Sequence, residues 1–96
     1  MEEKFDIGDI VLSKAGRDKG NYFVIMSLDD MFAQICDGDL HKTDSPKKKK
    51  LKHLKSMESC SEYIKEKLLQ DSKVTNKELR RAVSEFEEGT TSIENI

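Results

Sequence analysis

The sequence predicts a mainly β fold, a small five-stranded barrel that is followed by two C-terminal helices. Three observations support this prediction. The chain has 96 residues, which suffices for one small domain with an appendage and excludes a doubly wound nucleotide fold or a large catalytic cleft. Residues up to about 55 form short runs rich in β-branched and aromatic side chains, separated by turn residues. Apolar residues then recur every three or four positions, which is typical of amphipathic helices.

Short apolar runs and turn signals alternate through the first half of the chain. The expected strands cover residues 10–13, 22–28, 32–36, 40–42 and 51–54. Gly16 and Gly20 lie in the loop between the first two strands, and Asp37-Gly38 favours a tight reversal after the third. Pro46 breaks the chain before the last strand. Five short strands with frequent turns indicate a small barrel that is nearly all β.

A first helix is expected soon after Met57. The segment Ser59–Glu62 can cap its start, because hydroxyl and carboxylate side chains bond the free backbone N–H groups of a first helical turn. The apolar side chains of this helix are spaced three or four residues apart, which places them on one face. They are Cys60, Tyr63, Ile64 and Leu68, and Leu69 widens the stripe.

The start of the second helix is the clearest local signal in the chain. Thr75 and Glu78 have the spacing of a capping box, and Val74 can pack onto Leu79 as a hydrophobic staple. The apolar stripe of this helix falls at i, i+3, i+4 and i+7, and its members are Leu79, Ala82, Val83 and Phe86. Gly89 is expected to end the helix.

These signals divide the chain into three parts. Residues 1–56 are expected to form the barrel, and residues 57–88 a two-helix extension. The two helices are expected to form a hairpin that buries its apolar stripes against each other or against the barrel. Residues 89–96 are expected to be a disordered tail.

Charge is unevenly distributed along the chain. Charged residues make up 38% of it, and 17 basic residues against 19 acidic ones give a net charge of −2. Seven lysines and a single acid, Asp44, lie between His41 and Lys55, whereas acids predominate after Met57. A concentrated basic stretch in a nearly neutral chain indicates contact with a polyanion.

Cysteine use and hydropathy indicate where the protein acts. Cys36 and Cys60 match no paired spacing, and no signal-like apolar segment follows the acidic start of the chain. Nothing approaches the roughly eighteen consecutive apolar residues of a membrane helix. The sequence therefore predicts a soluble, cytoplasmic protein with free thiols and no membrane contact.

The loop between the first two expected strands is the first candidate site. It carries Lys14, Arg17 and Lys19, which suit contacts with nucleic-acid phosphates. It is not a nucleotide-binding P-loop, because Gly20 is followed by Asn21 and a strand, not by Lys-Ser/Thr and a helix. A structural alternative is that the glycines only permit the chain reversal and that the charges are simply solvated.

The lysine tract is the second candidate site. Lys47–Lys50 is followed by an alternation of apolar and basic residues, which predicts that Lys52 and Lys55 face outward. Four adjacent lysines repel one another unless counter-charge is near, so the tract favours a neighbouring polyanion. The alternatives are a solvated linker or a localisation signal.

The aromatic residues Phe5, Tyr22, Phe23 and Phe32 are expected mainly in the core or on the barrel surface and not as stacking platforms. Tyr22 and Phe23 are adjacent, however, so one ring must face outward, and Tyr22 is the candidate to offer its ring to a base.

The sequence does not predict an enzyme, a metal site or a cofactor. Cys36, His41, His53 and Cys60 are separated by five, twelve and seven positions, which lacks the short paired spacing of structural zinc sites. No nucleophile, base and acid occur together in a supporting local context. We therefore expect no catalytic residues and no small-molecule substrate.

The chain also resembles a known family. Residues 8–11, the loop Gly16–Gly20 and the strand to Leu28 resemble a KOW motif, with Gly20 matching its central glycine. Through residues 37–42 and on to Leu54, the sequence is similar to bacterial KOW-domain RNA-binding proteins. These in turn resemble the KOW-containing large-subunit ribosomal proteins of archaea and eukaryotes, the number fourteen group. The resemblance covers residues 5 to about 55.

The resemblance implies a five-stranded Src-homology-3-like barrel that binds RNA, often ribosomal RNA, through the loop joining its first two strands and neighbouring basic positions. The helices after Met57 have no counterpart in the motif. Together with the residues themselves, the resemblance gives these candidate RNA-binding residues: Lys14, Arg17, Lys19, Gly20, Tyr22, His41, Lys42, Lys47, Lys48, Lys49, Lys50, Lys52, His53 and Lys55.

Two functional hypotheses follow from the sequence. The first is a non-enzymatic RNA-binding protein that contacts ribosomal or other structured RNA, as part of a ribonucleoprotein in translation. The second is a module that docks onto a transcription or ribosome-associated protein through the barrel or the helices. The stripe from Leu79 to Phe86 discriminates between them, because docking through it requires that it be exposed.

Overall fold

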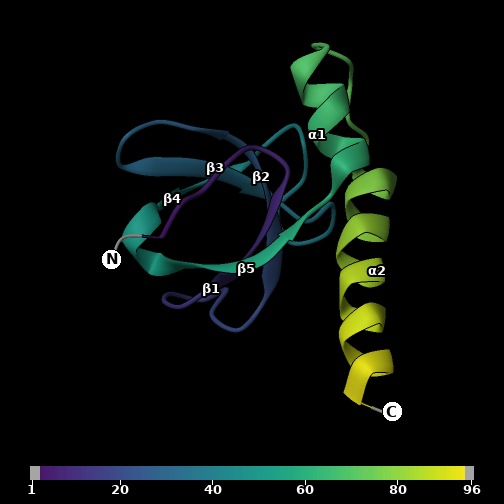
Figure 1. Cartoon of the computed structure of the whole chain (residues 1–96). Coiled ribbons are helices and arrows are strands. Elements are labelled where there is room, and N and C mark those ends of the chain that lie inside the picture. Colours follow the sequence, from purple (N-terminus) through teal and green to yellow (C-terminus); the bar gives the residue numbers. More distant parts are fainter. Residues whose placement is uncertain (1–2, 95–96) are drawn as a thin grey trace.

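The computed structural model describes residues 3–94 and shows a five-stranded antiparallel sheet with two helices along one side (Figure 1). The strands are β1 (Asp9–Ser13), β2 (Tyr22–Leu28), β3 (Phe32–Cys36), β4 (Lys47–Lys50) and β5 (Leu54–Cys60). A short 3-10 turn, η1 (Leu51–His53), joins the last two strands, and the helices are α1 (Glu62–Leu69) and α2 (Asn76–Glu94). The prediction of a mainly β chain is confirmed.

The strand order is β4-β3-β2-β1-β5, so two strands that follow each other in sequence lie at opposite edges of the sheet. Every neighbouring pair is antiparallel. Within residues 3–94 no ladder joins β4 to β5, so hydrogen bonding does not close the sheet into a barrel.

Both faces of the sheet are apolar, because the alternating side chains of the strands enter two separate clusters. Phe23 and Ile25 of β2 point to the inner face, and Val24 between them points to the outer face. The inner cluster consists of Val11, Phe23, Ile25, Ala33, Ile35 and Leu54. The outer cluster consists of Ile10, Val24, Cys36, Ile64, Val74 and Leu79. This two-sided burial explains the continuous apolar run of β2.

The apolar stripe of α2 packs inside the chain. Leu79 is fully buried in the outer cluster, and Ala82, Val83 and Phe86 are half-buried against it. The second helix therefore covers the outer face of the sheet, as Figure 1 shows. Docking through this stripe required it to be exposed, and the structure instead packs it against the outer cluster.

The second predicted helix start is confirmed atom by atom. The Thr75 N–H donates to Glu78 Oε1 at 2.9 Å, and the Glu78 N–H donates to Thr75 Oγ1 at 3.2 Å. Val74 and Leu79 are buried in the same cluster, as the predicted staple requires. Local sequence sets this helix start because both partners lie within one turn.

The first helix and the end of the second differ from expectation. The N-cap of α1 is Ser61, whose hydroxyl accepts from the Ile64 N–H at 3.3 Å, because β5 extends to Cys60. Gly89 does not end α2, which continues to Glu94. One exposed helical glycine costs only about 1 kcal/mol. The expected tail 89–96 is therefore helical to residue 94, and residues 95 and 96 lie outside the described part.

Two of the expected strands are also corrected. Residues 40–42 form no strand, because the Asp37 carboxylate accepts from the N–H groups of Asp39 and His41 and closes a local turn. The fourth strand is the lysine tract itself, which pairs with β3. Residues 51–53 form η1, and β5 then runs past residue 56, the expected end of the barrel. In Figure 1 the helices follow one another along the sheet, and Ile64 of α1 and Leu79 of α2 are buried in the outer cluster, so their apolar stripes pack against the sheet, which is one of the two expected arrangements.

Candidate nucleic-acid interface

The basic loop between β1 and β2 is closed by backbone hydrogen bonds. The Gly20 N–H donates to the Ser13 carbonyl at 2.9 Å, and the Ser13 N–H donates to the Asn21 carbonyl at 3.0 Å. Gly20 has a φ of +90°, a left-handed conformation that side-chain-bearing residues rarely adopt. A Cβ added there would meet nothing within 4 Å, so the loop backbone is open to solvent at this residue. The glycine is thus required for the backbone conformation and leaves space in front of it.

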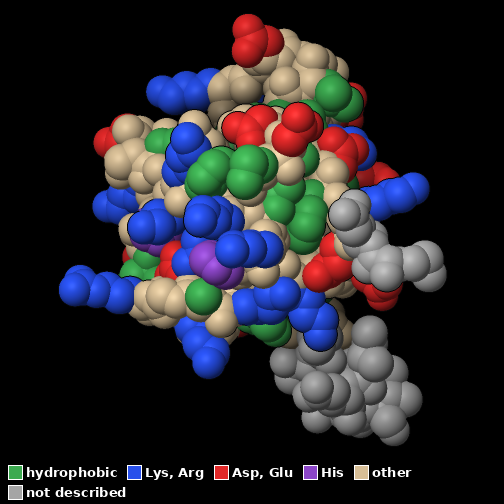
Figure 2. All heavy atoms as spheres, turned by 90° about the vertical axis from the view of Figure 1, so that its left-hand side faces the viewer, with side chains coloured by type: hydrophobic (Ala, Val, Ile, Leu, Met, Phe, Trp, Pro, Cys, Tyr) green, Lys and Arg blue, Asp and Glu red, His purple; other side chains and the backbone are tan. Residues whose placement is uncertain are grey.

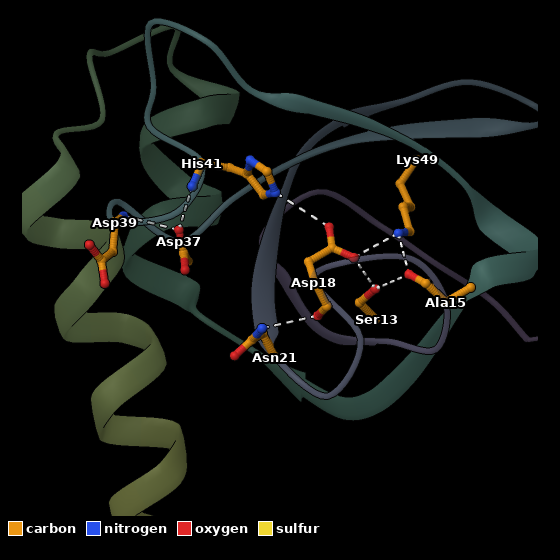
Figure 3. Close-up of polar contacts among 8 residues, drawn as sticks. All are labelled: Ser13, Ala15, Asp18, Asn21, Asp37, Asp39, His41 and Lys49. Atoms are coloured by element: carbon orange, nitrogen blue, oxygen red, sulfur yellow. Dashed lines mark hydrogen bonds and ion pairs between the residues drawn. The ribbon is translucent and has the colours of Figure 1, made fainter.

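A buried carboxylate, Asp18, holds this loop against a distant strand (Figure 3). Only 6% of Asp18 is exposed. Its Oδ1 accepts hydrogen bonds from the Ser13 hydroxyl and from Lys49 Nζ, both at 2.7 Å. Lys49 Nζ also donates to the Ala15 carbonyl at 2.6 Å, and His41 Nε2 lies 3.3 Å from Asp18 Oδ2. Side chains from β1, β4 and the β3–β4 loop therefore converge on one acid.

The partners of Asp18 keep it ionised despite its burial. Burial alone raises the pKa of a carboxyl group, because the low-dielectric interior disfavours its charge. The hydrogen bonds from Lys49 and Ser13, the Lys49 charge and the contact with His41 outweigh burial and lower the pKa of Asp18 to about 2. Asp18 and Lys49 consequently form a buried ion pair between the loop and β4.

This ion pair removes Lys49 from the candidate RNA-binding set. Only 8% of Lys49 is exposed, because alternation along β4 turns it toward the inner face, where it pairs with Ala33 of β3. His41 is likewise engaged with Asp18. The prediction that Lys49 faces a ligand is corrected, since its buried side chain instead fixes the loop, whereas His41, with 25% of its side chain exposed, stays a predicted RNA-binding residue.

Tyr22 is also corrected. Its ring is half-buried, with its centroid 5.1 Å from that of Phe86 in an edge-on arrangement. Phe23 is fully buried, as expected. Tyr22 does lie on the opposite face of β2, but α2 covers that face, which the strand pattern alone did not indicate.

The remaining basic candidates come from three segments that the fold brings next to one another. The Lys14 N–H donates to the His53 carbonyl at 2.8 Å, and Leu12 pairs with Lys55 in the β1–β5 ladder. A Cβ on Gly16 would lie 3.1 Å from Lys49 Nζ, so the loop also adjoins β4. The loop, the lysine strand and the start of β5 are therefore neighbours, although more than twenty-five positions separate the loop from the others.

We call the exposed basic side chains of these segments the basic face. Its members are Lys14, Arg17, Lys19, Lys47, Lys48, Lys50, Lys52 and Lys55, and the half-buried His53 lies among them in sequence. Among the side chains that the structure describes, none of these lysines, nor Arg17, takes part in an ion pair. Figure 2 shows Lys and Arg side chains gathered around histidine on one face. Lys42 is exposed on the loop between β3 and β4, outside these segments.

One residue of this region, Asp18, escaped the sequence analysis, and a second, Phe32, was expected only as a core or barrel-surface residue. Asp18 was passed over as one charge in a loop tip, although it is the single acid between Lys14 and Asn21. Phe32 is half-exposed at the start of β3, and Lys48 Nζ lies 4.6 Å from its ring centroid. The alternation of β3, in which Ala33 and Ile35 are apolar and Gln34 is polar, was the available signal for Phe32.

No group of three or more His, Cys, Asp or Glu side chains that could hold a metal ion occurs among the residues that the structure describes. None of the helices in the described part of the chain is long and apolar enough to cross a membrane. Neither a comparison with protein-family models nor one with curated proteins finds a match to this chain.

Proposed function

We propose that this chain is a non-enzymatic RNA-binding protein of the KOW class, which contacts ribosomal or other structured RNA in the cytoplasm as part of a ribonucleoprotein. One observation carries the proposal: three basic segments that are distant in sequence are neighbours around a loop that a buried ion pair fixes.

The chemistry of the basic face suits phosphates. Lysine and arginine side chains neutralise backbone charge and give affinity with little base specificity. Because Asp18 and Lys49 already fix the loop, less conformational freedom is lost when RNA binds. The open space in front of Gly20 allows a phosphate to approach the loop backbone closely.

The proposal includes a Src-homology-3-like barrel. Leu54 at one edge of the sheet and Ala33 next to the other edge belong to the same inner cluster. Phe5 and Leu51 pack against this cluster from segments outside the strands. The sheet is thus curved around a common core, which supports a barrel-like shape without a complete ring of hydrogen bonds.

Charge reversal tests the proposal. In the variant Arg17→Glu/Lys19→Glu, the loop would repel phosphates, and we expect affinity for a labelled RNA hairpin with single-stranded flanks to fall roughly tenfold or more. The matched control is Lys73→Glu/Lys77→Glu, which makes the same charge change on exposed residues beside and on α2. Fluorescence polarisation measures both. Equal losses in the two variants, or no RNA binding by the unmodified protein, would overturn the proposal.

A further inference from the structure

The helices leave one end of the outer sheet face uncovered. Phe32 pairs with Lys50 and Gln34 pairs with Lys48 in the β3–β4 ladder, so these four side chains share the outer face. Cys36, on the same face of β3, is buried in the outer cluster beneath the helices. Gln34, Lys48 and Lys50 are exposed, and Phe32 is half-exposed. An aromatic ring therefore reaches solvent between two lysines.

The backbone of Phe32 is fixed at the turn between β2 and β3. The Asp29 carboxylate accepts from the N–H groups of Met31 and Phe32, both at 2.9 Å, and the Asp29 N–H donates to the Phe32 carbonyl at 2.8 Å. The bonds from these two N–H groups lower the pKa of Asp29, so the turn keeps its charged acceptor. Phe32 is thus presented by a rigid turn.

One shallow hollow is lined by this ring, and a second is lined by its sequence neighbours Asp30 and Met31 together with residues 50–52. A hollow of about 150 Å³ is lined by Phe32, Lys48 and the β2–β3 turn, and one of about 230 Å³ is lined by Met31, Leu51, Lys50 and Lys52. Met31 is 64% exposed. Figure 2 shows hydrophobic side chains that reach the surface beside Lys and Arg side chains.

We propose that Phe32 is a base-stacking site for an unpaired nucleotide, with Lys48, Lys50 and Lys52 holding the phosphates on either side of it. This inference rests on the proposed function and names its substrate class, a single-stranded RNA segment. One exposed ring with basic side chains beside it matches a single unpaired base and the phosphates that flank it along a strand. A duplex keeps its bases stacked internally and would not use the ring. The Lys48 ammonium over Phe32 already shows that the ring accepts a partner on its face.

The test compares two probes that carry equal numbers of phosphates. One is an oligouridylate about twelve nucleotides long and the other is an abasic oligomer of the same length, both labelled for fluorescence polarisation. We expect the unmodified protein to bind oligouridylate roughly fivefold to a hundredfold more tightly than the abasic oligomer. Phe32→Leu should abolish this preference and leave the salt dependence unchanged, because the leucine keeps the apolar contact and no phosphate contact is lost.

A second variant gives a direct optical readout. The chain contains no tryptophan, so Phe32→Trp introduces a single tryptophan at the proposed site. We expect its fluorescence to be quenched by oligouridylate and to be unchanged by the abasic oligomer, while Phe32→Trp retains the preference for oligouridylate.

The outcomes separate this inference from the proposed function. Equal affinity for both probes, with Phe32→Leu unchanged, would overturn the stacking site and leave phosphate binding intact. Tighter binding to a duplex of equal length would overturn the single-stranded substrate. Failure to bind either probe would overturn the stacking site, and failure on the structured hairpin as well would overturn the proposed function.

Discussion

Two carboxylates have a lowered pKa for different reasons: Asp18 in the loop beside the basic face, and Glu78 at the start of α2. Asp18 is buried, and its pKa is about 2 because its contacts with Lys49, Ser13 and His41 outweigh the effect of burial. Glu78 is half-exposed, and hydrogen bonds from Lys67, Tyr63 and Thr75 lower its pKa to about 2 with little opposition from burial.

The difference lies in what each carboxylate connects. Glu78 completes a capping box with Thr75, three residues away, and receives a bond from Lys67 of α1. Asp18 joins a loop to Lys49, which lies 31 positions further along the chain. Loss of a partner leaves Glu78 in contact with water, whereas Asp18 would remain a buried charge without compensation. The two regions should therefore respond differently to similar mutations.

The largest expected effect comes from removing the helical side altogether. Deletion of residues 61–96, after the end of β5, would expose the outer cluster, including Ile10, Val24 and Cys36. Each fully buried side chain of this kind contributes about 1.5–3 kcal/mol, so we expect the melting temperature to fall steeply or cooperative melting to be lost. Thermal circular dichroism measures this. An unchanged melting curve would show that the sheet is stable without the helices.

The next effect concerns the buried ion pair. Lys49→Met would leave Asp18 charged and unpaired, and we expect it to lower the free energy of unfolding by about 3–5 kcal/mol. Lys48→Met, at the neighbouring exposed position, serves as the control and should change it by about 0.5 kcal/mol or less. Urea denaturation measures both. A loss below about 1 kcal/mol for Lys49→Met would mean that Asp18 is not held as described.

The pH dependence sharpens the same comparison. The pKa of Asp18 is lower in the folded chain than its ordinary value of 3.8, so the ion pair stabilises the fold above about pH 4. That stabilisation, on the order of 2 kcal/mol, is lost as the pH falls from about 4 to about 2 and the carboxylate is protonated. The difference in unfolding free energy between the unmodified chain and Lys49→Met should therefore shrink over this range. A difference that stays constant between about pH 6 and about pH 2.5 would contradict the assignment to Asp18.

The smallest effect is expected at the helix cap. Thr75→Ala removes the hydroxyl that accepts from the Glu78 N–H, and we expect it to lower the free energy of unfolding by about 1 kcal/mol. Thr75→Ser retains the hydroxyl and is the control. RNA affinity should be the same for both, because the cap does not touch the basic face. If Thr75→Ala lowered the free energy of unfolding as much as Lys49→Met does, the exposed cap would matter to stability as much as the buried ion pair, and the expected difference between Asp18 and Glu78 would be contradicted.

Local patterns predicted the fold only where the deciding contacts are local. The capping box of Thr75 and Glu78 and the β2 and β3 runs were predictable because each depends on neighbouring residues. The lysine tract was not predicted to be a strand, because lysine has no strong β preference and the ladder with β3 determines its conformation. The extension of β5 to Cys60 depends likewise on pairing with β1.

The candidate site was predictable in composition but not in geometry. The basic loop and the cluster of lysines supplied all of the exposed members of the basic face. The inward turn of Lys49 depends on the register between β3 and β4, which the sequence does not specify. The burial of Tyr22 depends on where α2 packs, because its ring contacts Phe86, which lies 64 positions further along the chain. Strand register and long-range packing therefore explain why the predictions for Lys49 and Tyr22 differed from the structure.

The salt dependence of RNA binding tests most directly whether the basic face binds phosphates as one surface. If about six phosphates are neutralised, the slope of log affinity against log salt for oligouridylate should be roughly −4. Lys19→Gln on the loop and Lys50→Gln on β4 should each make the slope shallower by about 0.7, and the double variant by about 1.4. Binding that is independent of salt, or a slope that only one of the two variants changes, would contradict a single phosphate-binding surface.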